Sequence, residues 1–544
     1  MRARVRCVPW LLLELVVHRF TSLAWCVWFL MGLLAFGAPK EKPNILILLA
    51  DDLGYSDLSC YGGEIETPEI DALAREGLRF TQIYNSGRCW PTRAALLSGY
   101  YAQEVRRDLA PGMLTGKGER QAWARLLPEM LAPLGYRSYH SGKWHIDGEP
   151  IENGFDRAYH LGDQERYFSP RLHNEDGKRL PPVERDSGYY ATEAVADRAI
   201  GYLREHWSEH GGKPFFAYVA FTAPHFPLQA KSEDIERVGR RYEAGWDRIR
   251  AQRWERIRQL GLTSGELSPV DRELGPPYAW PGTWETVGYQ EVFLSPPWDV
   301  LSAAQREHQI TKMTLHAAMV ERMDREIGRI IAELRRAGQL ENTLIFFLSD
   351  NGASSELLVR GDGHDPAAPP GSADSYLSLG PGWATVANTP FRRHKTWTHE
   401  GGIATPLVVH WPRGFEARGE LRHTPGHVID FVPTLLEIAG GSIAAVEMKN
   451  GRPPFRGASL AAAFHRDRAV ERPLWWHHEG NRALRRGDWK IVSPGPNAPW
   501  QLYNLAEDRS ETNNLASSRG ELVRELGLEW HRLADEIAQV AHTD

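Results

Sequence analysis

The sequence predicts an α/β fold: a large, mostly parallel or mixed sheet sandwiched by helices, and a smaller C-terminal domain with an antiparallel sheet and a helix. Residues 45–50 and 342–352 each contain a short, continuous apolar run, which is typical of a buried strand in a parallel sheet. Helical patterns at residues 66–76 and 314–340 lie between these runs. Strands that alternate with helices favour a sheet covered by helices.

Two further apolar runs, at residues 214–225 and 405–412, continue the alternation as expected strands. Residues 231–298 interrupt it, because they are rich in Arg, Pro and Trp, and we interpret them as an insertion near the rim of the active site. Its aromatic side chains either form a sugar-stacking rim or pack the insertion onto the body of the protein. The candidates for the rim are Trp280, Trp284, Tyr289 and Trp298.

The two ends of the chain differ from its middle. From residue 441 to residue 544 short apolar strands precede an amphipathic helix at 521–541, so we expect a small α+β domain after a main domain of residues 39–440. At the other end, three arginines precede an apolar stretch at residues 23–38. We expect residues 1–38 to be a signal peptide that exports the protein to the periplasm or the medium, without stable membrane insertion after cleavage. An uncleaved anchor and a start codon placed too far upstream are the alternatives.

Composition narrows the classes of function. A chain of 544 residues can bury one large core and one small one. Its 42% hydrophobic content is that of a folded globular protein, and its net charge of −6 gives no indication of nucleic-acid binding. Two of the four cysteines fall in the leader, so only Cys60 and Cys89 remain. A large domain has no need of a single disulfide, which makes a chemical role for one of them worth testing.

Polar side chains follow two of the expected strands. Asp51 and Asp52 come after the first run, and Asp350 and Asn351 come after the second. Ligands of such sheets bind beyond the carboxyl ends of the strands, so these four side chains are expected to converge there. Carboxylate and amide oxygens suit Ca²⁺ or Mg²⁺ rather than zinc. Ordinary turn or capping chemistry is the alternative for each pair.

Cys89 lies at an expected helix start, because Pro91 is typical of a first helical turn. Backbone N–H groups and the helix dipole favour anions at such a position. A buried structural thiol and a thiolate nucleophile are both compatible with this placement. A hard cation, however, is a poor partner for a thiolate.

The segment around Cys89 resembles a known signature. C-x-P-x-R followed by A-x-x-x-[ST]-G, here Cys89, Pro91, Arg93 and "AALLSG", resembles the signature of the type I sulfatases in the alkaline-phosphatase superfamily. The resemblance implies that Cys89 is oxidised to formylglycine by a formylglycine-generating enzyme, and that the hydrated aldehyde is the nucleophile. A gem-diol is an oxygen ligand, so it would also suit calcium. Trp90 departs from the family, where small residues are commoner, and could affect how the modifying enzyme reads the motif.

Five more motifs resemble the family in its order. "ADDLGYSDLSCYGG" resembles the first metal motif, and "GKWH", with Lys143 and His145, resembles the second sulfatase signature. "TAPHFPL" carries His225, "SDNG" carries Asp350 and Asn351, and "RRHKTWTHEGGIATPLVVHWP" carries Lys395. Two charged segments, "GWDRIRAQRWERIRQLGL" and "AAMVERMDREIGRII", look most like the bacterial arylsulfatase branch.

The resemblance implies a role for each residue. One Ca²⁺, with Mg²⁺ the less expected ion, would be held by Asp51, Asp52, modified Cys89, Asp350 and Asn351. Lys143 and Lys395 would neutralise the sulfate together with the ion. Arg93 would steady the diol, and Asp350 would take a proton from the attacking hydroxyl. His225, with Lys395, would protonate the leaving oxygen, and His145 would help to restore the aldehyde.

These implications predict a sulfuric ester hydrolase that cleaves aryl or carbohydrate sulfate monoesters. A phosphonate or phosphate ester hydrolase of the same superfamily is one alternative. A non-catalytic protein that binds sulfated glycans is another, and the complete set of Cys89, Arg93 and acid/base candidates argues against it.

Overall fold

The computed structural model describes residues 41–109, 118–278, 282–448 and 452–543. The chain divides into two units, residues 1–42 and 43–544, and the second holds all the elements discussed below. The expected signal peptide, residues 1–38, lies outside the described residues and stays a prediction. Of the helices that the structure describes, none has both the length and the hydropathy of a membrane span.

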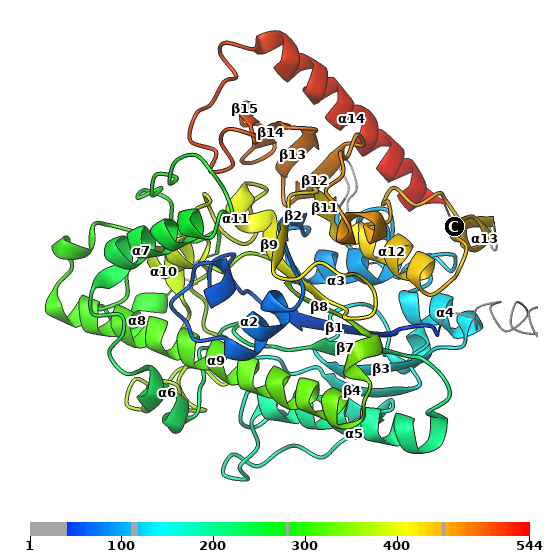
Figure 1. Ribbon diagram of the computed structural model, residues 1–544. Coiled ribbons are helices and arrows are strands. Elements are labelled where there is room, and N and C mark those ends of the chain that lie inside the picture. Colours follow the sequence, from blue (N-terminus) through cyan, green and yellow to red (C-terminus); the bar gives the residue numbers. More distant parts are fainter. Residues whose placement is uncertain (1–40, 110–117, 279–281, 449–451, 544) are drawn as a thin grey trace, which may run out of the picture. The chain divides into compact units, whose positions relative to one another are not determined.

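A mixed sheet forms the centre of the second unit (Figure 1). In the described part of the chain its strand order is β10-β2-β9-β8-β1-β7-β3-β4-β5-β6, with β11 also paired to β2. The central strand β1, Asn44–Ala50, runs parallel to both neighbours, whereas β9 is antiparallel to both β8 and β2. The other strands are β2 Leu78–Tyr84, β3 Arg137–Gly142, β4 Arg157–Leu161, β5 His173–Glu175, β6 Lys178–Arg179, β7 Phe215–Ala220, β8 Thr343–Ser349, β9 Ala404–His410, β10 Glu420–Arg422 and β11 Gly426–His427.

Helices cover both faces of this sheet (Figure 1). One face carries α2 Pro68–Arg75, α5 Ala191–His210 and α9 Ala303–Arg336. The other face carries α3 Cys89–Ser98, α4 Leu127–Leu131 and α12 Phe431–Ile438. Shorter helices lie in the connections: α10 Gly380–Ala387, α11 Glu400–Ile403 and α13 Ile443–Met448. The predicted fold class is confirmed.

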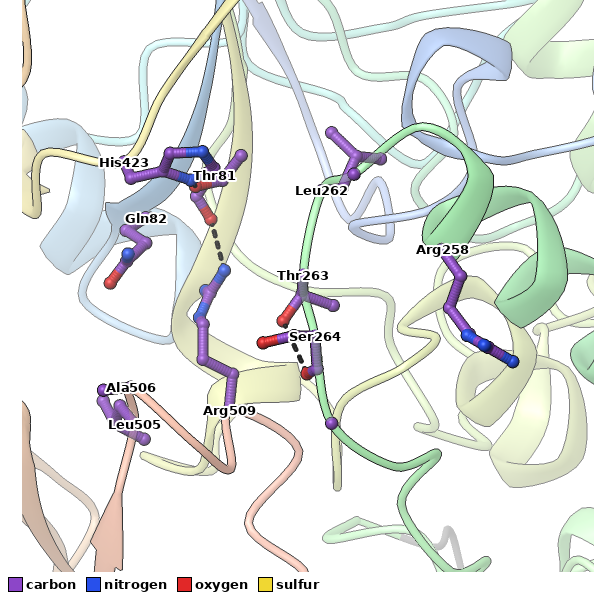
Figure 2. Close-up of a pocket in the computed structure, with 12 residues that line it drawn as sticks. Thr81, Gln82, Arg258, Leu262, Thr263, Ser264, His423, Leu505, Ala506 and Arg509 are labelled. Atoms are coloured by element: carbon purple, nitrogen blue, oxygen red, sulfur yellow. Dashed lines mark hydrogen bonds between the residues drawn. The ribbon is translucent and has the colours of Figure 1, made fainter.

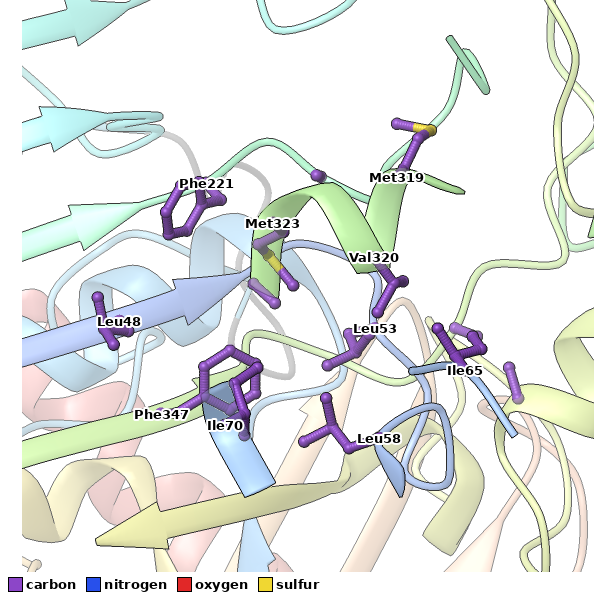
Figure 3. Packing of buried hydrophobic residues seen from close by; sticks show 14 of the residues in the cluster. Leu48, Leu53, Leu58, Ile65, Ile70, Phe221, Met319, Val320, Met323 and Phe347 are labelled. Atoms are coloured by element: carbon purple, nitrogen blue, oxygen red, sulfur yellow. The ribbon is translucent and has the colours of Figure 1, made fainter. Parts of the chain in front are cut away.

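The side chains of β1 alternate between two buried cores, as the pleat of a strand requires. Leu46 and Leu48 join the cluster on the α9 face, and Ile45, Ile47 and Leu49 join the cluster on the α3 face. Figure 3 shows Leu48 of β1 and Phe347 of β8 among side chains from α9 and α2. Because both faces of the strand are covered, its sequence is a continuous apolar run.

The helix boundaries differ from the sequence prediction in one place that matters. Helix α9 begins at Ala303, well before the expected residue 314. Ser302 caps it, because its side chain accepts a hydrogen bond from the backbone N–H of Gln305 and the Gln305 side chain bonds back to Ser302. The additional turns carry charged and polar side chains, so they lacked the apolar periodicity on which the prediction depended.

The insertion folds into α6 Ser232–Val238, α7 Gly245–Gln259 and α8 Thr283–Val287. Trp298 is not part of an open rim: it is only 7% exposed, and its ring lies 6.0 Å from that of Trp383 in α10, outside the insertion. Trp284 and Tyr289 are exposed, and Trp280 lies outside the described residues. Packing onto the body is therefore the right interpretation for Trp298.

A second, antiparallel sheet follows the main one along the chain. Its strands are β12 Leu474–His478, β13 Asn481–Arg486, β14 Trp489–Ser493 and β15 Gln501–Asn504. Helix α14, Gly520–His542, packs on it (Figure 1), and the rings of Trp475 and Trp530 stack with centroids 5.7 Å apart.

Candidate active site

The ends of β1 and β8 bring the predicted acidic residues together. The two strands are parallel with Ala50 opposite Ser349, so Asp51 and Asp350 leave the sheet at the same level. Asp52 adopts a left-handed backbone conformation with φ 65°, and its N–H donates to Asp350 Oδ1 over 3.3 Å. All three carboxylates are buried. The convergence expected from the sequence is therefore present.

Gly352 allows the turn after β8 to approach the segment after Lys395. A Cβ at Gly352 would lie 1.9 Å from the carbonyl oxygen of Gly401, closer than any side chain can come. The N–H of Gly352 also donates to the carbonyl of Gly402 over 3.0 Å. Only glycine fits this close backbone contact.

Cys89 and Arg93 occupy the first turn of α3. Cys89 is the first helical residue and is 3% exposed. Arg93, fully buried one turn later, forms an ion pair with Asp350 Oδ2 at 2.7 Å and donates to the carbonyl of Lys143 over 2.9 Å. Arg93 therefore holds the acidic strand end and the "GKWH" segment in one place.

The two predicted lysines reach the aspartates from different segments. Lys143, directly after β3, places Nζ 2.5 Å from Asp51 Oδ2. Lys395 places Nζ 2.8 Å from Asp52 Oδ1. Burial by itself would raise the pKa of Asp51, but Lys143, His225 and Arg93 outweigh it and hold that pKa well below its usual range. Asp51 is therefore an ionised carboxylate.

The two predicted histidines flank these charges. His225 Nε2 lies 3.7 Å from Asp52 Oδ2. His145 is half-buried and has a positive φ of 57°, which is uncommon for a non-glycine residue. Burial lowers the pKa of both rings, and Lys143 adds to the effect on His145. Both imidazoles are therefore less readily protonated than a free histidine side chain.

Cys89 and Asp350 have shifted acidities. Burial raises the pKa of the Cys89 thiol, in spite of nearby Lys143 and Lys395, so the unmodified residue is not a thiolate. Burial and the charge of Asp51 raise the pKa of Asp350 to about 7, against the opposing effect of Arg93. Asp350 is thus poised to exchange a proton near neutral pH. Cys60, the other described cysteine, is also a free thiol.

The donor set fits a hard divalent cation. One ligand atom each from Asp51, Asp52 and Cys89 lie within 4.8 Å of one another. Asp51 Oδ1 and Asn351 Oδ1 are buried and have no hydrogen-bond partner among the described residues. Buried polar atoms without partners are costly, and a bound cation would satisfy both oxygens. These oxygens point to calcium or magnesium chemistry rather than zinc.

Two residues at this site were missed from the sequence. Glu356, 1% exposed, pairs with Lys395 at 3.2 Å and with Arg88 at 2.8 Å. Arg88 immediately precedes Cys89 and places its guanidinium over the ring of Trp90, 5.2 Å from the centroid. A buried Glu356 side chain needs charged partners, but the sequence does not indicate which residues supply them.

A separate surface pocket of about 580 Å³ lies away from the predicted residues (Figure 2). The middle of β2, the chain after α7 and the segment after β15 line it, through residues such as Gln82, Thr263 and Arg509. None of the predicted metal or catalytic residues contributes to this pocket. The candidate active site is therefore defined by its chemistry rather than by the size of a cavity.

Comparisons with known proteins agree with this geometry. The family model described as "Sulfatase" matches residues 43–442. An uncharacterized sulfatase of Schizosaccharomyces pombe is 32% identical over 91% of this chain and 93% of its own length. An arylsulfatase of Klebsiella aerogenes is 31% identical over 80% of this chain and 96% of its own length.

A crystal structure of Ps i-CgsB in complex with k-i-k-neocarrahexaose has a TM-score of 0.64 and 23% identity, and the alignment covers 91% of this chain and 93% of that one. This likeness shows that the fold is shared. The chain belongs to the sulfatase family of sulfuric ester hydrolases.

Proposed function

We propose that this protein is an exported, calcium-dependent sulfatase that hydrolyses aryl or carbohydrate sulfate monoesters with a formylglycine made from Cys89. The observation that carries the proposal is the convergence of Cys89 with Arg93, two lysines, two histidines and three carboxylates in one buried site. Named relatives include an arylsulfatase of Klebsiella aerogenes and an N-acetylglucosamine-6-O-sulfatase of Bacteroides thetaiotaomicron. They support both substrate classes.

The balance of charge supports a bound divalent cation. Asp51, Asp52 and Asp350 offset the positive charges of Lys143, Lys395 and Arg93, so the protein alone has little net charge for an anionic substrate. Two further positive charges would make the buried site attractive to a sulfate ester. The ligands would be the carboxylates, the Asn351 oxygen and the modified residue at position 89. Calcium suits them better than magnesium because it accepts several carboxylates at once.

The Cys89 Sγ atom marks the place of the nucleophile. Formylglycine would supply a hydrated aldehyde, and one of its hydroxyl groups would attack sulfur. Asp350, whose charge acts on residue 89 across the site, would accept the proton of that hydroxyl. Arg93 holds the Asp350 carboxylate at 2.7 Å and so fixes its position beside the helix that begins at residue 89.

The leaving oxygen would receive its proton from the other side of the site. His225 and Lys395 both approach Asp52, at 3.7 and 2.8 Å. Lys395, held also by Glu356, would neutralise charge on the departing oxygen while His225 delivers the proton. His145 lies beside Trp90 and would take the proton whose removal restores the aldehyde. Burial of these groups limits access of water to the reacting atoms.

The modification would have to precede folding. Cys89 is 3% exposed in the folded chain, and Trp90 contacts the rings of His145 and His478. A formylglycine-generating enzyme would therefore read the motif in an extended segment. Export through the N-terminal leader remains part of the proposal.

Peptide mass spectrometry of residues 85–101, combined with kinetics, tests the proposal. We expect formylglycine at position 89 and calcium-dependent hydrolysis of 4-nitrophenyl sulfate. A matched Cys89→Ala variant serves as the inactive control. Activity from a preparation with wholly unmodified cysteine would rule out the mechanism. Faster turnover of 4-nitrophenyl phenylphosphonate than of the sulfate would assign the enzyme to phosphonate esters instead.

A further inference from the structure

The hairpin formed by β12 and β13 reaches the active site from outside the family-matched region, which ends at residue 442. Trp476 Nε1 donates to the carbonyl of Asn85 over 2.8 Å, four residues before Cys89. Asn481 Nδ2 donates to the carbonyl of Thr396 over 3.2 Å, one residue after Lys395. The hairpin therefore packs directly on the segments that carry the nucleophile and the leaving-group lysine.

The last residue of β12 presents an ordered but unused imidazole nitrogen. His478 Nδ1 lies 2.8 Å from Asp108 Oδ2, so the carboxylate accepts the Nδ1 proton and leaves Nε2 free to accept a hydrogen bond. His478 is 1% exposed, and Nε2 has no hydrogen-bond partner among the described residues. Glu479 Oε1 is 3.6 Å away, too far for a hydrogen bond. A buried nitrogen that is oriented and unpaired calls for a ligand.

The turn of the hairpin carries a residue that its backbone does not favour. His478 pairs with Asn481, so Glu479 and Gly480 form a two-residue turn with φ of 49° and 81°. Such turns favour Asn-Gly or Gly-Gly, because both central residues need positive φ. A glutamate held in a sparsely populated conformation beside an active site motivates a functional hypothesis. Its carboxylate also accepts a hydrogen bond from Tyr278 of the insertion.

An aromatic ring lies between this turn and the catalytic histidine. The half-buried Trp90 ring is 5.5 Å from His478 and 5.8 Å from His145, in edge contacts with both. The Arg88 guanidinium lies over this ring, 5.2 Å from the centroid, and His478 lies at its edge. A hydroxylated sugar ring would pack its C–H groups on the remaining aromatic surface, while its hydroxyls donate to the His478 imidazole and to the Glu479 carboxylate of the adjoining turn. An aryl group offers no hydroxyls to those acceptors.

We propose that His478 and Glu479, positioned by Asp108 and placed beside Trp90, form a sugar subsite that makes this sulfatase selective for carbohydrate sulfates over aryl sulfates. The inference rests on the proposed function, because the sulfate group must sit at Cys89 for the adjoining ring to reach the hairpin. It assigns a specificity role to the C-terminal sheet.

Equilibrium binding in a Cys89→Ala background tests the subsite without any need for modification or turnover. The probes are galactose 6-sulfate, N-acetylglucosamine 6-sulfate and phenyl sulfate, titrated by calorimetry in the presence of calcium. We expect the parent to bind at least one sugar sulfate more tightly than phenyl sulfate. Glu479→Gly and His478→Ala should each weaken that sugar binding by about ten-fold more than they weaken phenyl sulfate binding.

Two controls separate recognition from folding. Glu479→Gly suits the positive φ and should keep or raise the melting temperature, so a loss of sugar binding cannot be ascribed to a disrupted hairpin. His531→Ala, at an exposed histidine of α14, should change neither affinity. Equal losses for sugar and aryl sulfates, or a parent that prefers phenyl sulfate, would overturn the subsite. If enzyme that carries formylglycine hydrolyses none of these sulfates, the proposed function is wrong. The binding comparison in the Cys89→Ala background would still show whether His478 and Glu479 bind the sugar.

Discussion

Replacement of Lys490 by methionine tests how the C-terminal sheet is held to the catalytic core. Lys490 of β14 is fully buried, with Nζ 2.9 Å from Glu400 and 2.8 Å from Glu511. Burial alone would raise the pKa of Glu400, but Lys490 and Arg509 lower it to about 2, so Glu400 is ionised. Lys490→Met would leave this carboxylate beside Glu511 with one cation fewer.

The magnitude follows from the burial of the pair. Removal of one partner of a buried ion pair costs about 3–5 kcal/mol. An unfolding entropy of about 2.1 cal/mol/K per residue gives roughly 1 kcal/mol/K if residues 43–544 unfold as one unit. We therefore expect the melting temperature to fall by about 3–5 °C.

Differential scanning fluorimetry with parallel urea unfolding measures the change. Lys178→Met, at an exposed lysine of β6, is the matched control and should shift the melting temperature by less than about 1 °C. Adding Glu511→Gln to Lys490→Met should recover part of the loss, because it removes the repulsion between two buried carboxylates. A Lys490→Met protein as stable as the control, or a double variant less stable than the single one, would refute the reasoning.

Three other outcomes follow from the site and its supports. Burial raises the pKa of Asp324 to about 7, above its value in the unfolded chain, so its contribution to stability is present at low pH and is lost as pH rises through 7. The stability of Asp324→Asn relative to the wild type, measured by urea unfolding, should therefore increase between pH 5 and pH 8. Gly352→Ala should lower both the melting temperature and sulfatase activity, because its Cβ would meet the Gly401 carbonyl, whereas Gly212→Ala at an open position should change neither. Chelation with EGTA should abolish hydrolysis and lower the melting temperature, and Asp52→Ala should raise the calcium concentration needed for recovery by about ten-fold or more, by calcium titration.

The sequence alone predicts the layers of this fold because its central strands are simple. Residues 45–50 are apolar throughout, as a strand covered on both faces must be, and their polar continuation marks the strand end. The start of α9 escaped prediction because Ser302 and the polar turns after it carry a capping signal without apolar periodicity. Apolar periodicity predicts the bounds of an element where all of it is buried, and it fails where the end of a helix is exposed to solvent.

Some residues of the candidate site can be predicted from the sequence and others cannot. Asp51 and Asp350 can be paired from sequence, since each follows a buried strand and parallel strands end at one edge. Arg88 and Glu356 cannot, because they are far apart in the chain and meet only through tertiary packing. His478 cannot be assigned to the site from sequence either, because it lies far along the chain from Trp90, the neighbour of Cys89, and meets that ring only in the folded protein.

The residues proposed for the reaction and those proposed for substrate recognition lie in different parts of the chain. The family model ends at residue 442 and contains every residue proposed for chemistry, from Asp51 to Lys395. The hairpin at residues 474–486 lies beyond it, yet Trp476 and Asn481 fasten that hairpin to the segments beside Cys89 and Lys395. The buried ion pairs of Lys490 hold the same sheet in place, so a loss of that anchor would disturb the hairpin without touching the nucleophile. Sulfate chemistry and recognition of the organic group can therefore change separately, because they are built from different parts of the chain.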